Sequence, residues 1–457
     1  MFIYSGVKNF VHNLKPQTLL VIGFLIVIFT GSILLTFQFA SNSAPLNFVD
    51  SLFMSASATC VTGLSVVDIG SNLSFSGQLI ILVLIQIGGL GVMTFSTFLL
   101  LLIRGRFGIA SRELIQETLT YFDNIEIASL LKTVFLFAFL TEFIGALLLT
   151  IRFSFDMSLT EAAYSGIFHS ISAFCNAGFS IYSDSLIKYQ NDVFVNLVFI
   201  ILIILGGIGF IVAFEVRTQF EKKFSWYRLS LHSKIVLAFT PILILFGFLF
   251  IFFLEYNHSM KDLDIGTKIL ASIFQSVASR TAGFNTVDIS SISISSIVII
   301  SMLMFIGASS ASCGGGIKTS TFVVILAYIK ARLNSTNNVN IFYSSIPQSI
   351  VTKSILIFSF SFFTIVLFSF LLAVVELKGG SLYEEGTIYI QLVFETVSAF
   401  GTVGLSTGIT SSLSDLSKLL VSILMFIGRL GPITIALVIG SKETIEVKYA
   451  EDKIIVG

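Results

Sequence analysis

A short phrase centred on a glycine recurs four times along the chain. The glycines are Gly63, Gly178, Gly283 and Gly404, which lie 115, 105 and 121 residues apart. Each phrase follows a short, half-apolar segment and stands between two long apolar runs. Four such loops that enter a membrane and meet around one axis are what an ion-selectivity filter requires.

The composition is that of a membrane protein. Of the 457 residues 55% are hydrophobic and 11% are charged, and the mean hydropathy is +0.97. Soluble domains carry roughly 25% charged residues, so we expect a polytopic chain in a lipid bilayer. Lys plus Arg equals Asp plus Glu at 26 each, which excludes a charge bias toward nucleic acid. No catalytic or metal-ligating set stands at useful spacing, so no enzyme and no cofactor within the chain are expected.

The apolar runs predict four tandem units. A spanning helix needs about 20 mostly apolar residues, and eight runs meet this length: 17–38, 78–103, 129–151, 193–216, 231–255, 292–329, 350–376 and 415–440. Four shorter segments lie between the members of each pair: 48–58, 160–173, 266–278 and 386–399. The predicted fold is therefore all-α, with eight spanning helices and four half-helices in helix–pore-loop–helix repeats around a pseudo-fourfold pore.

These runs also set the expected boundaries. The chain divides into a leading segment, four repeats and a tail: 1–16, 17–103, 129–216, 231–330 (with a broken second helix), 350–440 and 441–457. Lys and Arg concentrate on the side of the membrane that holds the two termini, which predicts cytoplasmic termini and glycine phrases that open outward. A glycine recurs in each second helix, at Gly88, Gly206, Gly307 and Gly428. Close helix packing or a hinge would explain these four glycines.

The phrases have the chemistry of a cation filter. Backbone carbonyls can replace the water shell of a cation without adding fixed charge, and glycine tolerates the dihedral angles that such a backbone needs. Each half-helix directs the negative end of its dipole toward the pore. The candidate ion-binding residues are Val61, Thr62, Gly63, Asn176, Ala177, Gly178, Thr281, Ala282, Gly283, Thr402, Val403 and Gly404.

The sixth run is interrupted beneath the predicted filter. Small polar residues and three successive glycines occupy 307–321 and cannot hold a helix well. The candidate gate residues are Ser309, Ser310, Ser312, Gly314, Gly315, Gly316, Lys318 and Arg429. A charged Arg429 inside the eighth run is costly in a bilayer, so we expect it to face a partner or water. A plain kink remains an alternative for the interruption, and Lys318 could instead extend to the cytoplasmic face.

With its four phrases, the segment from Ser279 to Asn285 and the broken sixth helix, the chain resembles the Trk/Ktr/HKT superfamily of potassium transporters. The short lead before the first span resembles the Ktr ion-conducting membrane subunit. The resemblance implies that the four glycines coordinate K⁺, and that residues 307–321 obstruct and gate the pore next to Arg429. It also implies a homodimer in the cell membrane, docked on a cytosolic ring of regulatory subunits that bind ATP or ADP.

Two other functions remain open. Some plant members of the superfamily that favour sodium carry serine in place of the first glycine, whereas Gly63 is a glycine here. This favours potassium, but a sodium-permeable or sodium-coupled transporter of the same fold is an alternative. A membrane enzyme or receptor without transport activity is a remote alternative, because it leaves the four glycine phrases unexplained.

Overall fold

The computed structural model describes residues 16–104, 127–220, 225–377, 379 and 381–431. Helices dominate this part of the chain, and its one small sheet is the hairpin of β1 (Asn340–Ile341) and β2 (Ser344–Ser345). The all-helical class predicted from the sequence is confirmed. The N-terminal segment 1–15 and the tail 441–457 lie outside the described residues.

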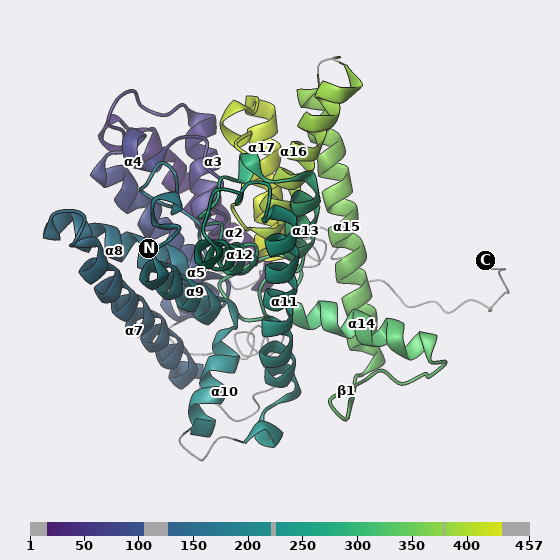
Figure 1. The fold of residues 1–457 in the computed structure, drawn as a ribbon. Helices are drawn as coiled ribbons and strands as arrows, with labels where there is room; N and C mark the ends of the chain where they lie inside the picture. Colours follow the sequence, from purple (N-terminus) through teal and green to yellow (C-terminus); the bar gives the residue numbers. More distant parts are fainter. Residues whose placement is uncertain (1–15, 105–126, 221–224, 378, 380, 432–457) are drawn as a thin grey trace.

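The helices follow the predicted order within each repeat. The first helices are α2 (Pro16–Thr36), α7 (Ile127–Phe153), α11 (Leu231–Glu255) and α15 (Gln348–Glu376). The half-helices are α3 (Phe48–Thr59), α8 (Leu159–Phe174), α12 (Ile265–Ala278) and α16 (Leu382–Gly401). The second helices are α5 (Phe75–Arg104), α9 (Val193–Gly207) with α10 (Phe210–Phe220), α13 (Ile294–Phe305) with α14 (Thr319–Leu333), and α17 (Asp415–Leu430). In Figure 1 α12 lies near the middle of the molecule, whereas α8 lies beside α7 at the left.

The described residues show only some of the eight predicted spans as single helices long and apolar enough to cross a membrane. Among the described residues four qualify by length and composition, in α2, α7, α11 and α15, and a fifth span forms if α9 and α10 are taken together. The sixth run is divided between α13 and α14, as its interruption predicted. The last part of the eighth run, 432–440, lies outside the described residues.

The fourth run is not the single helix that was predicted over 193–216. Two helices, α9 and α10, meet there at an angle of 98°. Gly209 at the break has a φ of +92°, a left-handed conformation that glycine adopts without steric cost. The Phe210 N–H donates to the carbonyl of Ala311 at 2.8 Å instead of to its own helix. The break in the fourth run therefore lies against the interruption of the sixth run and is hydrogen-bonded to it.

Each half-helix packs closely on the first helix of its repeat. In three repeats a half-helix serine donates to a first-helix carbonyl: Ser55 to Ile28 at 2.7 Å, Ser170 to Glu142 at 2.6 Å and Ser276 to Ile244 at 2.7 Å. A glycine of the first helix faces each serine, and a Cβ there would lie less than 3.0 Å from the serine oxygen. The serine and glycine together hold the half-helix at a fixed depth.

The glycines of the second helices serve close packing. A Cβ on Gly88, Gly206 or Gly428 would lie less than 3.0 Å from a carbonyl oxygen at the end of the half-helix of the same repeat. In the third repeat Gly307 instead lies against the carbonyl of Gly315 in the interrupted segment. Of the two explanations left open by the sequence, close packing accounts for these positions.

Replacing Gly428 with alanine is expected to destabilise the protein. The new methyl group would overlap the backbone carbonyl of Phe400, which cannot move as a side chain could, and overpacking of this kind costs about 1–3 kcal/mol or more. The measurement is the thermal unfolding temperature of the purified protein in detergent. Gly386→Ala is the control, because nothing lies within 4 Å of a Cβ added there. Equal unfolding temperatures for the two variants would contradict the packing role.

Candidate functional site

The four glycine phrases share one backbone conformation. A non-glycine residue with positive φ comes two positions before each glycine, and the glycine itself also has positive φ. The values are +56° and +98° for Val61 and Gly63, +58° and +70° for Asn176 and Gly178, +74° and +75° for Thr281 and Gly283, and +49° and +92° for Thr402 and Gly404. Positive φ is uncommon in residues with a side chain and costs free energy. Its recurrence in all four phrases indicates a conformation that the site requires.

The four phrases meet in a closed ring. A Cβ added to each glycine would lie less than 3.0 Å from a backbone carbonyl oxygen of the next repeat. The pairs are Gly63 with Ala177, Gly178 with Ala282, Gly283 with Val403, and Gly404 with Thr62. The fourth repeat thus contacts the first, and every predicted filter glycine lies beside its neighbour's carbonyl. The ring has no room for a side chain at any of these four positions.

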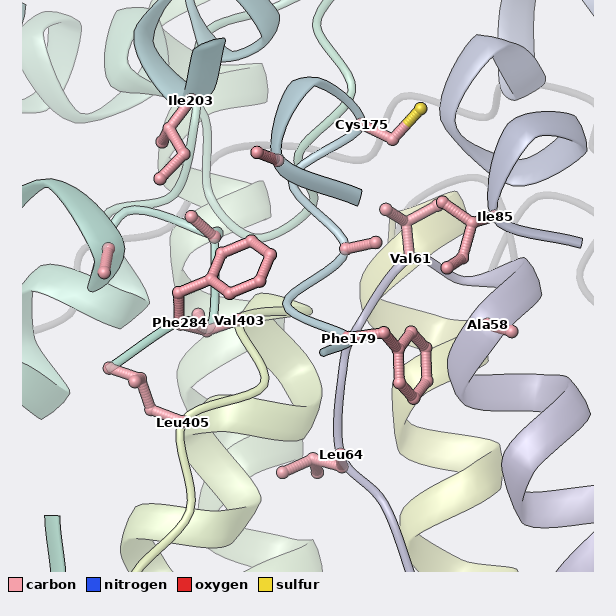
Figure 2. Close-up of a cluster of buried hydrophobic side chains, with 14 of the residues drawn as sticks. Ala58, Val61, Leu64, Ile85, Cys175, Phe179, Ile203, Phe284, Val403 and Leu405 are labelled. Carbon is pink, nitrogen blue, oxygen red and sulfur yellow. The ribbon is translucent and has the colours of Figure 1, made fainter. Parts of the chain in front are cut away.

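The residue that follows each glycine anchors its loop. Leu64, Phe179, Phe284 and Leu405 are each at most 1% exposed and belong to the main hydrophobic core. Figure 2 shows them in one buried cluster together with Val61 and Val403. The glycine presents backbone to the ring while the next side chain holds the loop in the protein. The sequence analysis did not predict these anchors, although an apolar residue follows each glycine in the sequence.

Serines of the half-helices support the loops from behind. Ser57 and Ser398 stand six residues before their glycines and accept from the glycine N–H groups at 3.2 Å and 3.1 Å. Ser172 has the same place in the second repeat and donates to the carbonyl of Phe179 at 2.7 Å. The third repeat has Val277 there. The recurrence of serine at one spacing is the signal that could have predicted these residues.

A cavity opens on one side of the ring, next to the residues that follow the glycines. Its volume is about 350 Å³, and it is lined by all four glycines, several Ser and Thr side chains, and one carboxylate, that of Asp68. Partial burial raises the pKa of Asp68, but hydrogen bonds from Ser183 and Ser71 outweigh it and bring the pKa below its usual value. Asp68 is therefore ionised at neutral pH, and a negative charge at this position attracts cations.

The interrupted segment, here called the gate loop (residues 306–318), lies directly against the other side of the ring. The Gly315 N–H donates to Oγ1 of Thr402 at 3.0 Å. A Cβ on Gly314 would lie less than 3.0 Å from Oγ1 of Thr281, and one on Gly315 would meet Thr402 as closely. These glycines let the gate loop pass immediately beneath the predicted filter.

The gate loop is also held by the break in the fourth run. The Ser309 N–H donates to the carbonyl of Gly207 at 3.1 Å, and the Cys313 N–H donates to that of Gly206 at 3.2 Å. Both carbonyls lie at the end of α9, where the helix leaves its last carbonyls without helical partners. The last carbonyls of α9 therefore find their hydrogen-bond donors in the N–H groups of the gate loop.

Two basic side chains bind the gate loop. Arg429 is 7% exposed and donates to the carbonyls of Cys313 in the gate loop and Gly88 in α5. Lys318 donates through Nζ to the carbonyl of Gly314 at 2.5 Å, so its side chain folds back onto the loop and does not extend to the membrane surface. Both cations thus lie beneath the ring, on the far side from Asp68.

The remaining predicted gate residues stabilise the loop locally. Ser312 donates to the carbonyl of Ser309 at 2.7 Å, and the hydroxyls of Ser310 and Ser320 lie 3.0 Å apart. Gly316 has a φ of +66°. A further contact joins the loop's end to the third phrase, because Arg280 donates to the hydroxyl of Thr319 at 3.1 Å.

Comparisons with known proteins agree with this fold. The family model of TrkH, described as a cation transport protein, matches residues 9–444. The chain is 40% identical over 444 residues to the Ktr system potassium uptake protein B of Bacillus subtilis, covering 97% of each chain. It is 33% identical over 450 residues to the potassium/sodium uptake protein NtpJ of Enterococcus hirae, covering 97% of this chain and 98% of that one. The crystal structure of the potassium transporter TrkH from Vibrio parahaemolyticus has a TM-score of 0.73 at 18% identity, covering 93% of this chain and 86% of that one.

Fold and family match together identify a polytopic membrane protein that transports cations. The chain belongs to the TrkH family, and two of its relatives are named potassium uptake protein B of a Ktr system. The family consists of ion transporters, so the alternative of a membrane enzyme is excluded.

Replacing Thr402 with valine is expected to loosen the gate loop. Valine keeps the shape but removes the acceptor of the Gly315 N–H, and an unpaired buried donor costs about 1–3 kcal/mol. The readout is the rate at which a small thiol reagent labels Cys313 in a chain whose Cys60 and Cys175 are alanine, and we expect it to rise roughly tenfold. Thr402→Ser keeps the acceptor and is the control. Equal labelling of Cys313 in both variants would refute this role of Thr402.

Proposed function

We propose that the chain takes up potassium across the cell membrane through a selectivity filter of backbone carbonyls. The observation that carries this proposal is the closed ring in which each of Gly63, Gly178, Gly283 and Gly404 lies against the next repeat's carbonyl. Carbonyls grouped around one axis can replace the water shell of K⁺ without a fixed charge. The ends of the four half-helices add their negative dipole potential at the same place.

The gate loop is the proposed barrier to this path. It passes beneath the ring and is bound by Thr402 and Arg429. Its own Lys318 bonds back to the carbonyl of Gly314. The positive charge of Arg429 below the filter opposes the passage of a cation, and the hydrogen bonds of Arg429 and Lys318 hold the loop in the blocking position. Opening requires that these bonds break together and that the loop leaves the end of α9.

The chain is proposed to work under the control of other subunits. Relatives are named as proteins of a Ktr system, which supports a membrane component that acts with a separate subunit. In this proposal two copies form a homodimer, and a cytosolic ring that binds ATP or ADP moves the gate loop. The concentration of basic residues on the side of the termini supports cytoplasmic termini in the cell membrane.

A sodium-permeable or sodium-coupled transporter is the second candidate. The potassium/sodium uptake protein of Enterococcus hirae, at 33% identity, supports it by name. Four intact glycines favour potassium selectivity but do not exclude a sodium requirement. Sodium uptake by the unaltered chain as fast as its potassium uptake would favour this second function.

Replacing Gly63 with serine tests the filter. Serine would place Cβ against the carbonyl of Ala177 in a backbone with φ of +98°, so the ring must widen or distort. We expect potassium uptake into proteoliposomes to fall about tenfold or more relative to sodium uptake, since overpacking against the ring costs about 1–3 kcal/mol. The measurement is the ratio of the two uptake rates.

Gly408→Ser is the matched control for this experiment. Gly408 also has positive φ, +94°, but nothing lies within 4 Å of a Cβ added there, so serine brings backbone strain without crowding the ring. Gly63→Ser protein that is folded but keeps the potassium-to-sodium ratio of the control would refute the carbonyl filter.

Replacing Arg429 with glutamine tests the barrier. The change removes the charge and weakens the hydrogen bonds to Cys313 and Gly88; bonds from charged groups contribute about 1.5–3 kcal/mol each. Potassium uptake in the absence of any other subunit should therefore rise about tenfold or more. Arg332→Gln, which removes an exposed arginine of α14 bonded to Asn337, should leave uptake unchanged. A lower or equal rate for Arg429→Gln would contradict the barrier role.

A further inference from the structure

A second large cavity lies on the side of the gate loop away from Asp68. Its volume is about 520 Å³, and its walls come from α10, the start of α11, α14, the start of α15 and the gate loop itself. It shares no lining residue with the cavity at the mouth of the ring. The second cavity is therefore separate from the proposed filter and its mouth.

The walls of this cavity are mainly apolar. Ile211, Phe214, Ile235, Val324 and Ile357 line it. Its volume is within the range of roughly 300–1,000 Å³ that is usual for sites of organic ligands, which combine apolar walls with a few polar groups. A long apolar group fits these walls better than a hydrated ion.

Two polar side chains of the lining favour an anion. Lys353 lines the cavity, is exposed and has no ion pair with any described residue. His232 also lines the cavity, and its Nε2 has no hydrogen-bond partner in the described part of the chain. The one carboxylate, Glu215, already accepts from Ser230 and Ser233 at the start of α11. A cation and an unused imidazole nitrogen thus remain for an anionic group.

The cavity adjoins the surface that faces the bilayer. Ile350, at its edge, is 47% exposed, and Leu356 and Phe360 continue the exposed apolar side of α15. Exposed apolar side chains along a long apolar helix are typical of contact with lipid. An occupant can therefore enter from the bilayer with its apolar part in the cavity and its charged part at Lys353.

We infer that this cavity binds one anionic phospholipid, with its phosphate at Lys353 and His232 and an acyl chain against the apolar walls. Ser310 of the gate loop is part of the lining, and its hydroxyl lies 3.0 Å from that of Ser320 in α14. The bound lipid therefore contacts the loop and biases its position. This regulatory part of the inference rests on the proposed gate, whereas lipid binding does not.

Lipid retention tests the site without any transport measurement. The full chain is purified in detergent, incubated with an equimolar mixture of phosphatidylglycerol and phosphatidylcholine, and the lipids bound to each chain are counted by native mass spectrometry. We expect preferential retention of one phosphatidylglycerol. Lys353→Gln should reduce this retention about fivefold, the effect expected of one lysine near an anionic lipid surface. Val324→Phe, which narrows the cavity at its apolar wall, should reduce it as well.

Lys132→Gln is the matched control, because Lys132 is an exposed lysine of α7 outside the cavity. Equal loss of phosphatidylglycerol from Lys132→Gln and Lys353→Gln, or no preference between the lipids, would overturn the inference. Displacement of the lipid by millimolar inorganic phosphate would also overturn it, since the site would then recognise a free anion.

Uptake then tests the regulatory part. Potassium uptake by the unaltered chain should differ between vesicles with and without phosphatidylglycerol, and Val324→Phe should reduce the difference. A site that retains lipid without any effect on uptake would overturn the link to the gate loop and leave the filter untouched. Loss of potassium selectivity in Gly63→Ser is a separate result and does not depend on this cavity.

Discussion

The fold depends on the contact between successive loops of the ring. Each loop must bring its backbone so close to the next that no side chain fits at the glycine, and this has to hold at all four junctions at once. The half-helices, their serine hydrogen bonds to the first helices and the glycines of the second helices all place loop backbone at one depth. The long helices form the frame that this placement requires.

The third repeat carries the exception on which gating is proposed to depend. In the other repeats the second-helix glycine packs on the end of a half-helix, but Gly307 packs on Gly315 of the gate loop. The loop gives up helical hydrogen bonds and replaces them with bonds to the end of α9, to Thr402 and to Arg429. Such a segment is held by a few contacts that can break together, whereas a continuous helix would have to unfold.

The sequence predicted the parts of the fold that repeat. The spacing of the glycines, the apolar runs and the weak segment over 307–321 predicted the helix order, the loops and the interruption. The bend at Gly209 was missed, because the run 193–216 is apolar enough to be read as one span and the bend's partner in space, Ala311, is about a hundred residues away. The anchors such as Phe284 were missed for another reason: an apolar residue after each glycine is visible in the sequence, but in so hydrophobic a chain this does not show that it is buried as an anchor.

The ring is built from one chain, so its four quarters have different sequences although they share one backbone shape. The third quarter lacks the supporting serine of the other three and has Val277 instead. In an assembly of four identical subunits, a single substitution changes every quarter at the same time. Here each quarter can change by itself, so selectivity and opening can be adjusted in small steps during evolution while three quarters keep the original ring.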